Sequence, residues 1–251
     1  MSLLKVRGLG KSFGGVRAVD GIDFDIAPGE LLALIGPNGA GKSTTFNMVN
    51  GQLRADSGSI QLEGTELVGL APRRIWALGV GRTFQIAETF ASLTVLENVQ
   101  MALLSADRRV YTFFSRAAEH RRADALALLA QVGMAEQADR PCSVLAYGDV
   151  KRVELAVAMA NGPQLLLMDE PTAGMAPRER GALMQVASGA ARRDAIAVLF
   201  TEHDMDVVFG HADRVIVLDR GTILAQGAPG AIRADPRVRD AYLGTEATRA
   251  G

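Results

Sequence analysis

The sequence predicts an α/β fold with a parallel sheet at its core. Three observations support this prediction: short apolar runs alternate with helical segments, one run leads directly into a glycine-rich loop, and a helix-rich stretch interrupts the alternation. The chain has 251 residues, of which 48% are hydrophobic and 22% charged, the balance of a globular protein with a sizeable core. These proportions exclude a disordered chain, a collagen and a disulfide-stapled miniprotein.

Charge, cysteine content and hydropathy narrow the class of protein. Lys and Arg number 27 and Asp and Glu 28, so the net charge is -1 and we expect no nucleic-acid partner. A single cysteine, Cys142, excludes an intramolecular disulfide and favours a reducing, cytoplasmic compartment. The strongest apolar runs, at 165–168 and 196–200, are far shorter than the ~20 residues of a membrane-spanning helix. We therefore expect a soluble protein.

The N-terminal part predicts strands around one helix. Residues 3–7 and 22–26 are predicted strands, the second because apolar residues alternate with aspartates. Leu31–Ile35 is a continuous apolar run that predicts a buried strand. A helix is expected to follow over 43–53, and the alternation over 58–63 predicts an antiparallel strand.

The middle of the chain, over about 94–132, predicts a helical insert. Thr94 and Glu97 form a capping-box pattern before an apolar run, and residues 117–132 are rich in good helix formers. The alternation of strands and helices then resumes. Strands are predicted at 165–168 and 196–200, a helix at 178–192, and a hairpin from 215–218 and 222–225.

A phosphate-binding loop is the strongest local motif. Residues 36–43 spell G-P-N-G-A-G-K-S, which matches G-x-x-x-x-G-K-[ST] between a predicted buried strand and a predicted helix. Glycines let the backbone wrap closely around a phosphate, and the helix N-terminus adds positive potential there. Lys42 is expected to bridge the β- and γ-phosphates, and Ser43 to ligate Mg²⁺. The predicted nucleotide-binding residues are Gly36, Pro37, Asn38, Gly39, Ala40, Gly41, Lys42, Ser43 and Thr44.

Two carboxylates and a histidine follow the later buried strands. Asp169 and Glu170 come directly after residues 165–168, and ligands bind at the carboxyl ends of parallel strands. Asp169 is expected to hold Mg²⁺, and Glu170 to polarise a water that attacks the γ-phosphate. His203 follows the strand at 196–200 and is expected to reach the same phosphate. Solvated acids at a strand end and a structural histidine are the alternatives for each motif taken alone.

The whole motif set resembles the ATP-binding cassette (ABC) family of transport ATPases over about residues 3–244. Phe13 stands where that family places an aromatic residue that stacks on adenine. Gln85 matches the family's catalytic glutamine, which reaches Mg²⁺ and the attacking water. The family's signature sequence corresponds to Leu145, Ala146, Tyr147, Gly148 and Asp149.

This resemblance implies one ABC ATPase domain over 1–251. Its parts would be a P-loop NTPase (RecA-like) parallel-sheet core with an antiparallel β subdomain, over 1–88 and 161–251, and a helical subdomain over 89–160. This sequence departs from the family pattern at two places. Ala146 replaces the signature serine, a form that is familiar in the amino acid importer subgroup. Ala176 replaces the usual Asp or Asn in the loop 173–176, which follows Asp169 and Glu170, and this change removes a polar contact between subunits.

Within the family, the sequence is most similar to the ATP-binding subunit of branched-chain amino acid importers. The Ala-Tyr-Gly form of the signature, Thr-Glu-His-Asp-Met at 201–205 and the ending at 239–244 carry this similarity. It implies ATP hydrolysis, with ATP and Mg²⁺ bound, that drives import through separate transmembrane permease subunits. It also implies a second ATPase subunit, an indirect solute-binding protein and attachment to the cytoplasmic face of the inner membrane.

Other functions remain open alternatives at this level. An export ATPase, for example for lipid or lipopolysaccharide, has a similar ending at 239–244. A non-transport cassette ATPase usually needs tandem cassettes or a long coiled coil, and this chain has one phosphate loop and no sustained heptads. A GTPase would be expected to carry Asn-Lys-x-Asp, and no lysine here follows an asparagine. A small-molecule kinase would need an acceptor pocket and a lid, for which we find no signal.

Overall fold

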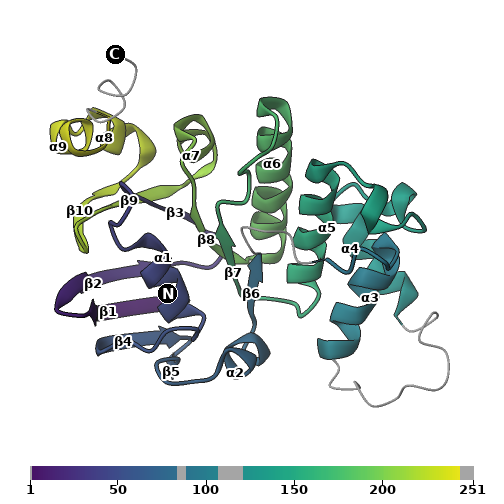
Figure 1. Ribbon diagram of the computed structural model, residues 1–251, viewed down its shortest axis with the longest axis horizontal. Helices are drawn as coiled ribbons and strands as arrows, with labels where there is room; N and C mark the ends of the chain where they lie inside the picture. Colours follow the sequence, from purple (N-terminus) through teal and green to yellow (C-terminus); the bar gives the residue numbers. More distant parts are fainter. Residues whose placement is uncertain (1, 84–88, 107–120, 244–251) are drawn as a thin grey trace.

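The computed structural model describes residues 2–83, 89–106 and 121–243. A six-stranded sheet in the order β10-β9-β3-β8-β7-β6 forms its centre (Figure 1). The strands β9, β3, β8, β7 and β6 are parallel, and β10 pairs with β9 antiparallel. Their bounds are β3 (Leu31–Ile35), β6 (Val80–Thr83), β7 (Leu165–Asp169), β8 (Ala197–Thr201), β9 (Arg214–Asp219) and β10 (Thr222–Gly227). The predicted α/β class and parallel sheet are confirmed.

A second, fully antiparallel sheet has the order β2-β1-β4-β5. Its strands are β1 (Leu4–Phe13), β2 (Val16–Ile26), β4 (Ser57–Leu62) and β5 (Thr65–Glu66). The strands β1 and β2 extend well beyond the predicted ranges, to a two-residue turn at Gly14 and Gly15, where φ is +52° and +86°. Positive φ at both central positions gives a turn whose twist matches a β-hairpin, so pairing continues to the tip.

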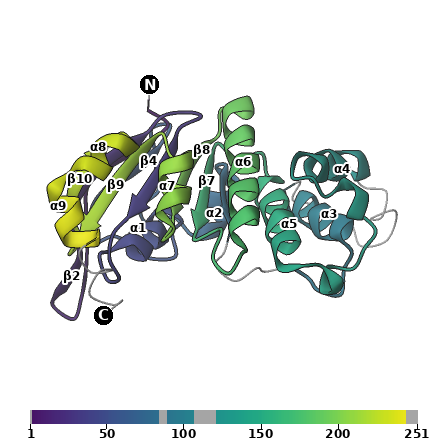
Figure 2. The same cartoon turned by 90° about the horizontal axis from the view of Figure 1, so that it is seen from above.

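The helices pack on the faces and at one end of the central sheet. They are α1 (Lys42–Val49), α2 (Pro72–Ala77), α3 (Val95–Ala106), α4 (Arg122–Gln131), α5 (Tyr147–Met159), α6 (Pro177–Asp194), α7 (Met205–His211), α8 (Pro229–Ala234) and α9 (Pro236–Val238). The described residues also include two short 3₁₀-helices, η1 (Ala135–Gln137) and η2 (Cys142–Val144), and a π-helix, η3 (Arg239–Leu243). Figures 1 and 2 both show α3, α4 and α5 gathered at one end of the molecule, with both sheets toward the other.

Local hydrogen bonds and a glycine set the start of α3 and the end of α1. The capping box before α3 is confirmed: the N–H of Thr94 donates to Glu97 Oε2 at 2.8 Å, and the N–H of Glu97 donates to Thr94 Oγ1 at 3.2 Å. The helix α1 ends at Val49, earlier than the predicted end at residue 53. The chain leaves the helix at Asn50, and Gly51 has φ +75°, a left-handed conformation that ends helices.

The central sheet separates two hydrophobic cores. In β3, Leu31, Ala33 and Ile35 belong to one core, while Leu32 and Leu34 belong to the other. The first core includes residues of α3, α5 and α6, and the second includes α1 and the antiparallel sheet. A strand buried on both faces needs a continuous apolar run, which explains why β3, β7 and β8 were readily predicted.

Candidate nucleotide-binding site

The loop between β3 and α1 forms a tight backbone cradle. At Gly36, with φ +152°, a Cβ would lie 2.2 Å from the carbonyl oxygen of Leu218. At Gly41, with φ +105°, a Cβ would lie 2.4 Å from the carbonyl oxygen of Ala18. Only glycine fits at these two positions, so the loop can pass close to its neighbours and around a ligand. The first turn of α1 follows at once, with N–H groups that have no partner within the helix.

Lys42 lies under this loop as a buried cation. Its Nζ donates to the carbonyl oxygens of Gly36 at 2.7 Å and Pro37 at 3.1 Å. Burial lowers the pKa of Lys42, and the negative charges of Glu170 and Asp169 oppose that shift. The ammonium group therefore faces both the loop and the two carboxylates. Asn38 and Gly39 are exposed at the loop surface, Ala40 is buried, and Ser43 and Thr44 are exposed and half-buried at the start of α1.

The ends of β7 and β8 are joined by Thr201. Its Oγ1 donates to Asp169 Oδ1 at 2.8 Å, and the N–H of Glu170 donates to the carbonyl oxygen of Thr201 at 3.2 Å. The other oxygen of Asp169, Oδ2, lies 3.5 Å from the guanidinium of Arg82 on β6. Glu170 adopts φ +47°, which is uncommon for a residue with a side chain and turns the chain sharply after the strand. Residues strained in this way are often found at functional sites.

Glu170 and His203 contact one another at the same edge of the sheet. Glu170 Oε1 lies 2.9 Å from His203 Nε2. The side chains are 22% and 48% exposed, respectively, so water can reach both. Lys42, Asp169, Glu170 and His203 thus come together from the carboxyl ends of β3, β7 and β8, where ligands bind in parallel sheets.

The predicted signature residues lie elsewhere. Leu145 and Ala146 precede α5, and Tyr147, Gly148 and Asp149 begin it. The Tyr147 ring packs against Gly174, where an added Cβ would lie 3.3 Å from the ring. The N–H of Asp149 donates to the carbonyl oxygen of Ala146, so the N–H groups of Tyr147 and Gly148 are the more available donors. No hydrogen bond joins 145–149 to 36–44 within the part of the chain that the structure describes.

Of the two remaining predicted residues, Phe13 is described by the structure and Gln85 is not. Phe13 ends β1 with its side chain 49% exposed, and Lys11 Nζ lies 5.6 Å from the centre of its ring. A half-exposed aromatic ring can stack on a flat ligand. Gln85 lies outside the described residues.

Four polar residues around this site are not among those predicted from the sequence. They are Arg82, Thr172, Thr201 and Glu202. Arg82 was missed because β6 has the sequence Val-Gly-Arg-Thr, which lacks an apolar run and becomes a strand by pairing with β7. Thr201 could have been found, because it directly follows the apolar residues of β8 and is therefore placed at the same sheet edge as Asp169.

The oxygen atoms present suit a small divalent cation. Ser43 offers a hydroxyl at the first turn of α1, and Asp169 offers a carboxylate at the end of β7. Mg²⁺ prefers such oxygen ligands and is commonly held by one or two side chains together with substrate phosphates and water. Among the described residues no group of three or more His, Cys, Asp or Glu side chains is placed to hold a metal ion.

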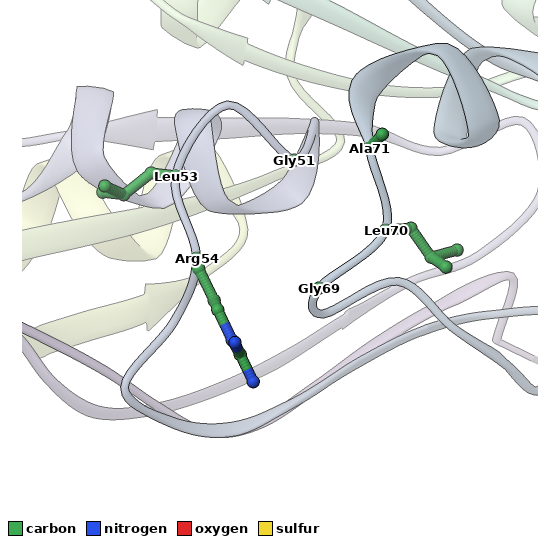
Figure 3. A pocket seen from close by; sticks show the side chains of 6 residues that line it. All are labelled: Gly51, Leu53, Arg54, Gly69, Leu70 and Ala71. Atoms are coloured by element: carbon green, nitrogen blue, oxygen red, sulfur yellow. The ribbon is translucent and has the colours of Figure 1, made fainter.

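A cavity of about 350 Å³ lies apart from this site (Figure 3). It is lined by Gly51, Leu53, Arg54, Gly69, Leu70 and Ala71. The first three follow the C-terminal end of α1, and the last three precede α2. Because the phosphate loop precedes the other end of α1, this cavity is not part of the candidate nucleotide site.

Comparison with known proteins places this geometry in a family. The ABC transporter family matches residues 19–173, and the family described as branched-chain amino acid ATP-binding cassette transporter matches residues 222–248. The high-affinity branched-chain amino acid transport ATP-binding protein LivG of Escherichia coli (strain K12) is 39% identical over 249 residues, covering 96% of this chain and 98% of LivG. The corresponding protein BraF of Pseudomonas aeruginosa is 36% identical over 252 residues, covering 96% of this chain and 98% of BraF.

Solved structures agree with the sequence relatives. The ADP conformation of an ATP-binding cassette of an ABC transporter superimposes with a TM-score of 0.88 at 29% identity, covering 97% of this chain and 99% of that one. A dimeric cassette in a post-hydrolysis state, bound to ADP and Pi, gives 0.76 at 25% identity, covering 90% and 98%. Within the described residues no helix has the length and apolar character needed to cross a membrane. The chain, with its glycine-rich loop at the end of β3, belongs to the ABC transporter family as an ATP-binding cassette.

Proposed function

We propose that this chain is the ATP-hydrolysing subunit of an importer of branched-chain or related amino acids. The observation that carries the hydrolytic part is the meeting of Lys42, Glu170 and His203 beside a loop in which glycines leave room for phosphates. The family match and the names of LivG and BraF support the transport part. They favour import over the alternatives of an export ATPase or a non-transport cassette ATPase.

Hydrolysis follows from the positions of these side chains. The backbone N–H groups of the loop after Pro37 hold the β- and γ-phosphates, and Lys42 turns from the loop carbonyls toward their negative oxygens. Glu170 accepts a proton from a water molecule as that water bonds to the γ-phosphorus. The bond from this phosphorus to the β–γ bridging oxygen breaks, which releases ADP and phosphate. His203 Nε2 contacts Glu170 Oε1 at 2.9 Å. Because a neutral imidazole has one N–H to donate, His203 would leave that carboxylate and donate to the γ-phosphate when ATP is bound.

Mg²⁺ would be held by Ser43, Asp169 and Gln85, and when bound it neutralises charge on the β- and γ-phosphate oxygens. The hydrogen bond from Thr201 to Asp169 keeps that carboxylate oriented toward the phosphate loop. Phe13 would stack on the adenine ring from the tip of the β1–β2 hairpin.

The position of the signature residues, 145–149, favours a second subunit. Leu145, Ala146, Tyr147, Gly148 and Asp149 make no hydrogen bond to the phosphate loop within the described part of this chain. We therefore infer that two cassettes pair head to tail, so that each signature contacts the nucleotide held by the other. A dimer of this kind is a state that bound ATP favours, and hydrolysis releases it. The partner cassette is a second copy of this chain or a paralogue, and dimerisation of Glu170→Gln with MgATP distinguishes the two.

The same proposal places the chain at a membrane. Residues 89–160 would form a helical subdomain that contacts transmembrane permease subunits on the cytoplasmic face of the inner membrane. A separate solute-binding protein would deliver the amino acid to the permease without touching this chain. No nucleic-acid partner is proposed, in keeping with the net charge of -1.

Uptake by a reconstituted transporter tests the transport part. The chain is co-purified with its permease subunits and solute-binding protein, placed in proteoliposomes with ATP, and supplied with radiolabelled leucine. We expect ATP-dependent leucine uptake that unlabelled isoleucine and valine compete away, and no uptake with Glu170→Gln. If only urea, an amide or an aromatic acid competed with the label, and isoleucine and valine did not, that compound would be the transported solute and the branched-chain assignment would be wrong. ATP hydrolysis with export of the label would refute import.

A further inference from the structure

Glu202 is a buried carboxylate that the hydrolytic mechanism does not use. It lies between Thr201, the last residue of β8, and His203, and only 3% of its surface is exposed. A buried charge is costly unless several hydrogen bonds compensate it. Its hydrogen-bond partners therefore indicate what the carboxylate does.

Glu202 joins the two loops that carry Glu170 and His203. Its Oε1 accepts from the N–H of Thr172 at 2.8 Å and from Thr172 Oγ1 at 2.7 Å. Its Oε2 accepts from the N–H of His203 at 3.2 Å. Thr172 is itself 2% exposed, so without Glu202 its two donors would have no access to water.

Thr172 in turn controls the course of the loop after β7. The N–H of Ala173 donates to the carbonyl oxygen of Glu170 at 3.1 Å, and the N–H of Met175 donates to that of Thr172 at 3.1 Å. These two turns overlap at Thr172. Fixing Thr172 therefore fixes both the turn that begins at Glu170 and the turn that leads to the loop touching Tyr147.

We propose that Glu202 is a positioning residue for ATP hydrolysis, which holds the Glu170 loop and the His203 loop in one relative position. This inference rests on the proposed hydrolytic function. The distance of 2.9 Å between Glu170 Oε1 and His203 Nε2 depends on two loops that leave different strands. One carboxylate that accepts from both loops sets that distance, because neither loop can shift without losing a hydrogen bond to it.

Two substitutions separate the two halves of this bridge. Glu202→Ala removes both, and a displacement of about 1 Å between Glu170 and His203 is expected to lower kcat by roughly 10²-fold. Glu202→Gln keeps an oxygen for Thr172 but turns an NH₂ group toward the N–H of His203. We therefore expect a smaller loss, about tenfold in kcat. The KM for ATP is expected to change by less than about threefold in both variants, because the phosphate loop is untouched.

Glu30→Ala is the matched control. Glu30 is also a well-bonded carboxylate: it accepts from the N–H of Ala27 at 2.7 Å and from Arg214 Nε at 2.8 Å. It precedes β3, whereas the phosphate loop follows that strand. We expect a lower thermal midpoint and an unchanged kcat per folded molecule. Equal losses of kcat per folded molecule in Glu202→Ala and Glu30→Ala would reduce Glu202 to a structural role and overturn the proposal.

A readout that does not depend on hydrolysis completes the test. The ring signals of His203, one of three histidines, are assigned by NMR from their loss in His203→Gln. We expect them to move in Glu202→Ala and Glu202→Gln and to stay in place in Glu30→Ala. Unmoved signals, or wild-type kcat in Glu202→Ala, overturn the positioning role. A wild-type chain without ATPase activity in which the ring signals still move refutes the proposed function and supports the positioning.

Discussion

Replacing Glu170 by glutamine is the most direct test of the hydrolytic site. The substitution exchanges one carboxylate oxygen for an NH₂ group and keeps the shape of the side chain. The remaining amide oxygen can still accept a hydrogen bond from His203 Nε2, now 2.9 Å from Glu170 Oε1. The N–H of residue 170 still donates to Thr201, so the link between β7 and β8 is unaffected. What disappears is the carboxylate that we propose as the acceptor of the attacking water's proton.

The magnitude follows from these contacts. Loss of a positioned general base costs about 10²–10⁴-fold in kcat, equivalent to roughly 2.7–5.4 kcal/mol of transition-state stabilisation. Stability changes little, because the side chain is partly exposed and its backbone φ of +47° is equally strained for both residues. A partly exposed substitution of this kind changes unfolding free energy by about 0.5 kcal/mol or less, or roughly 1–2 °C in Tm.

Steady-state phosphate release, calorimetric ATP binding and light scattering after size exclusion provide the assay. We expect ATP binding to survive, turnover to fall by at least about 10²-fold, and a dimer to form with MgATP but not without it. Turnover equal to wild type would refute the assignment of Glu170 as the base. A monomer that still binds ATP would indicate an obligatory paralogue or permease, and a monomer that binds none would refute the nucleotide site itself.

Three further predictions concern other parts of the chain. Lys42→Ala is expected to weaken ATP binding by about 10- to 100-fold in calorimetry, because a charged donor to phosphate is lost, whereas exposed Lys5→Ala leaves the affinity unchanged. Gly41→Ala is expected to lower unfolding free energy by about 1–3 kcal/mol in urea titrations, since its Cβ would lie 2.4 Å from the Ala18 carbonyl oxygen. Gly39→Ala, with open space around its Cβ, should cost less, and an equal cost would contradict the clash. Burial raises the pKa of Cys142 above its ordinary 9.0, so its stabilising contribution is complete below pH 9 and is lost as pH rises through the folded pKa. In urea titrations between about pH 8 and 10.5, we expect the free energy of unfolding to decline less steeply with pH in Cys142→Ala than in wild type. Parallel declines in the two proteins would contradict a contribution from Cys142.

Much of the fold was predictable because it depends on local pattern. The apolar runs of β3, β7 and β8 are buried on both faces, and a strand of that kind has a recognisable sequence. The capping box of Thr94 and Glu97 involves residues three apart, so its hydrogen bonds could be expected before the structure. The phosphate loop is contiguous, and therefore its glycines and Lys42 could be assigned together.

Other elements could not be assigned from local pattern. The strand β6, with sequence Val-Gly-Arg-Thr, has one strongly apolar residue and forms because β7 offers it unpaired backbone groups. The strands β1 and β2 pair as far as Phe13 and Val16, on either side of the turn at Gly14 and Gly15. The length of this hairpin depends on pairing between the strands, which the pattern within each strand does not show. Arg82 and Asp169 are far apart in sequence and become neighbours only because their strands are adjacent.

By itself, the sequence determined the α/β class, the phosphate loop and the identity of Glu170 and His203 as candidates, because each depends on residue type and short spacing. Only the tertiary structure decided that Glu170 and His203 lie 2.9 Å apart and that Glu202 accepts hydrogen bonds from both of their loops. The tertiary structure likewise separated the signature at the start of α5 from the phosphate loop. The physical reason is that these relations join residues on different strands and helices, whose relative placement is set by the packing of two cores and by the order of strands in the sheet.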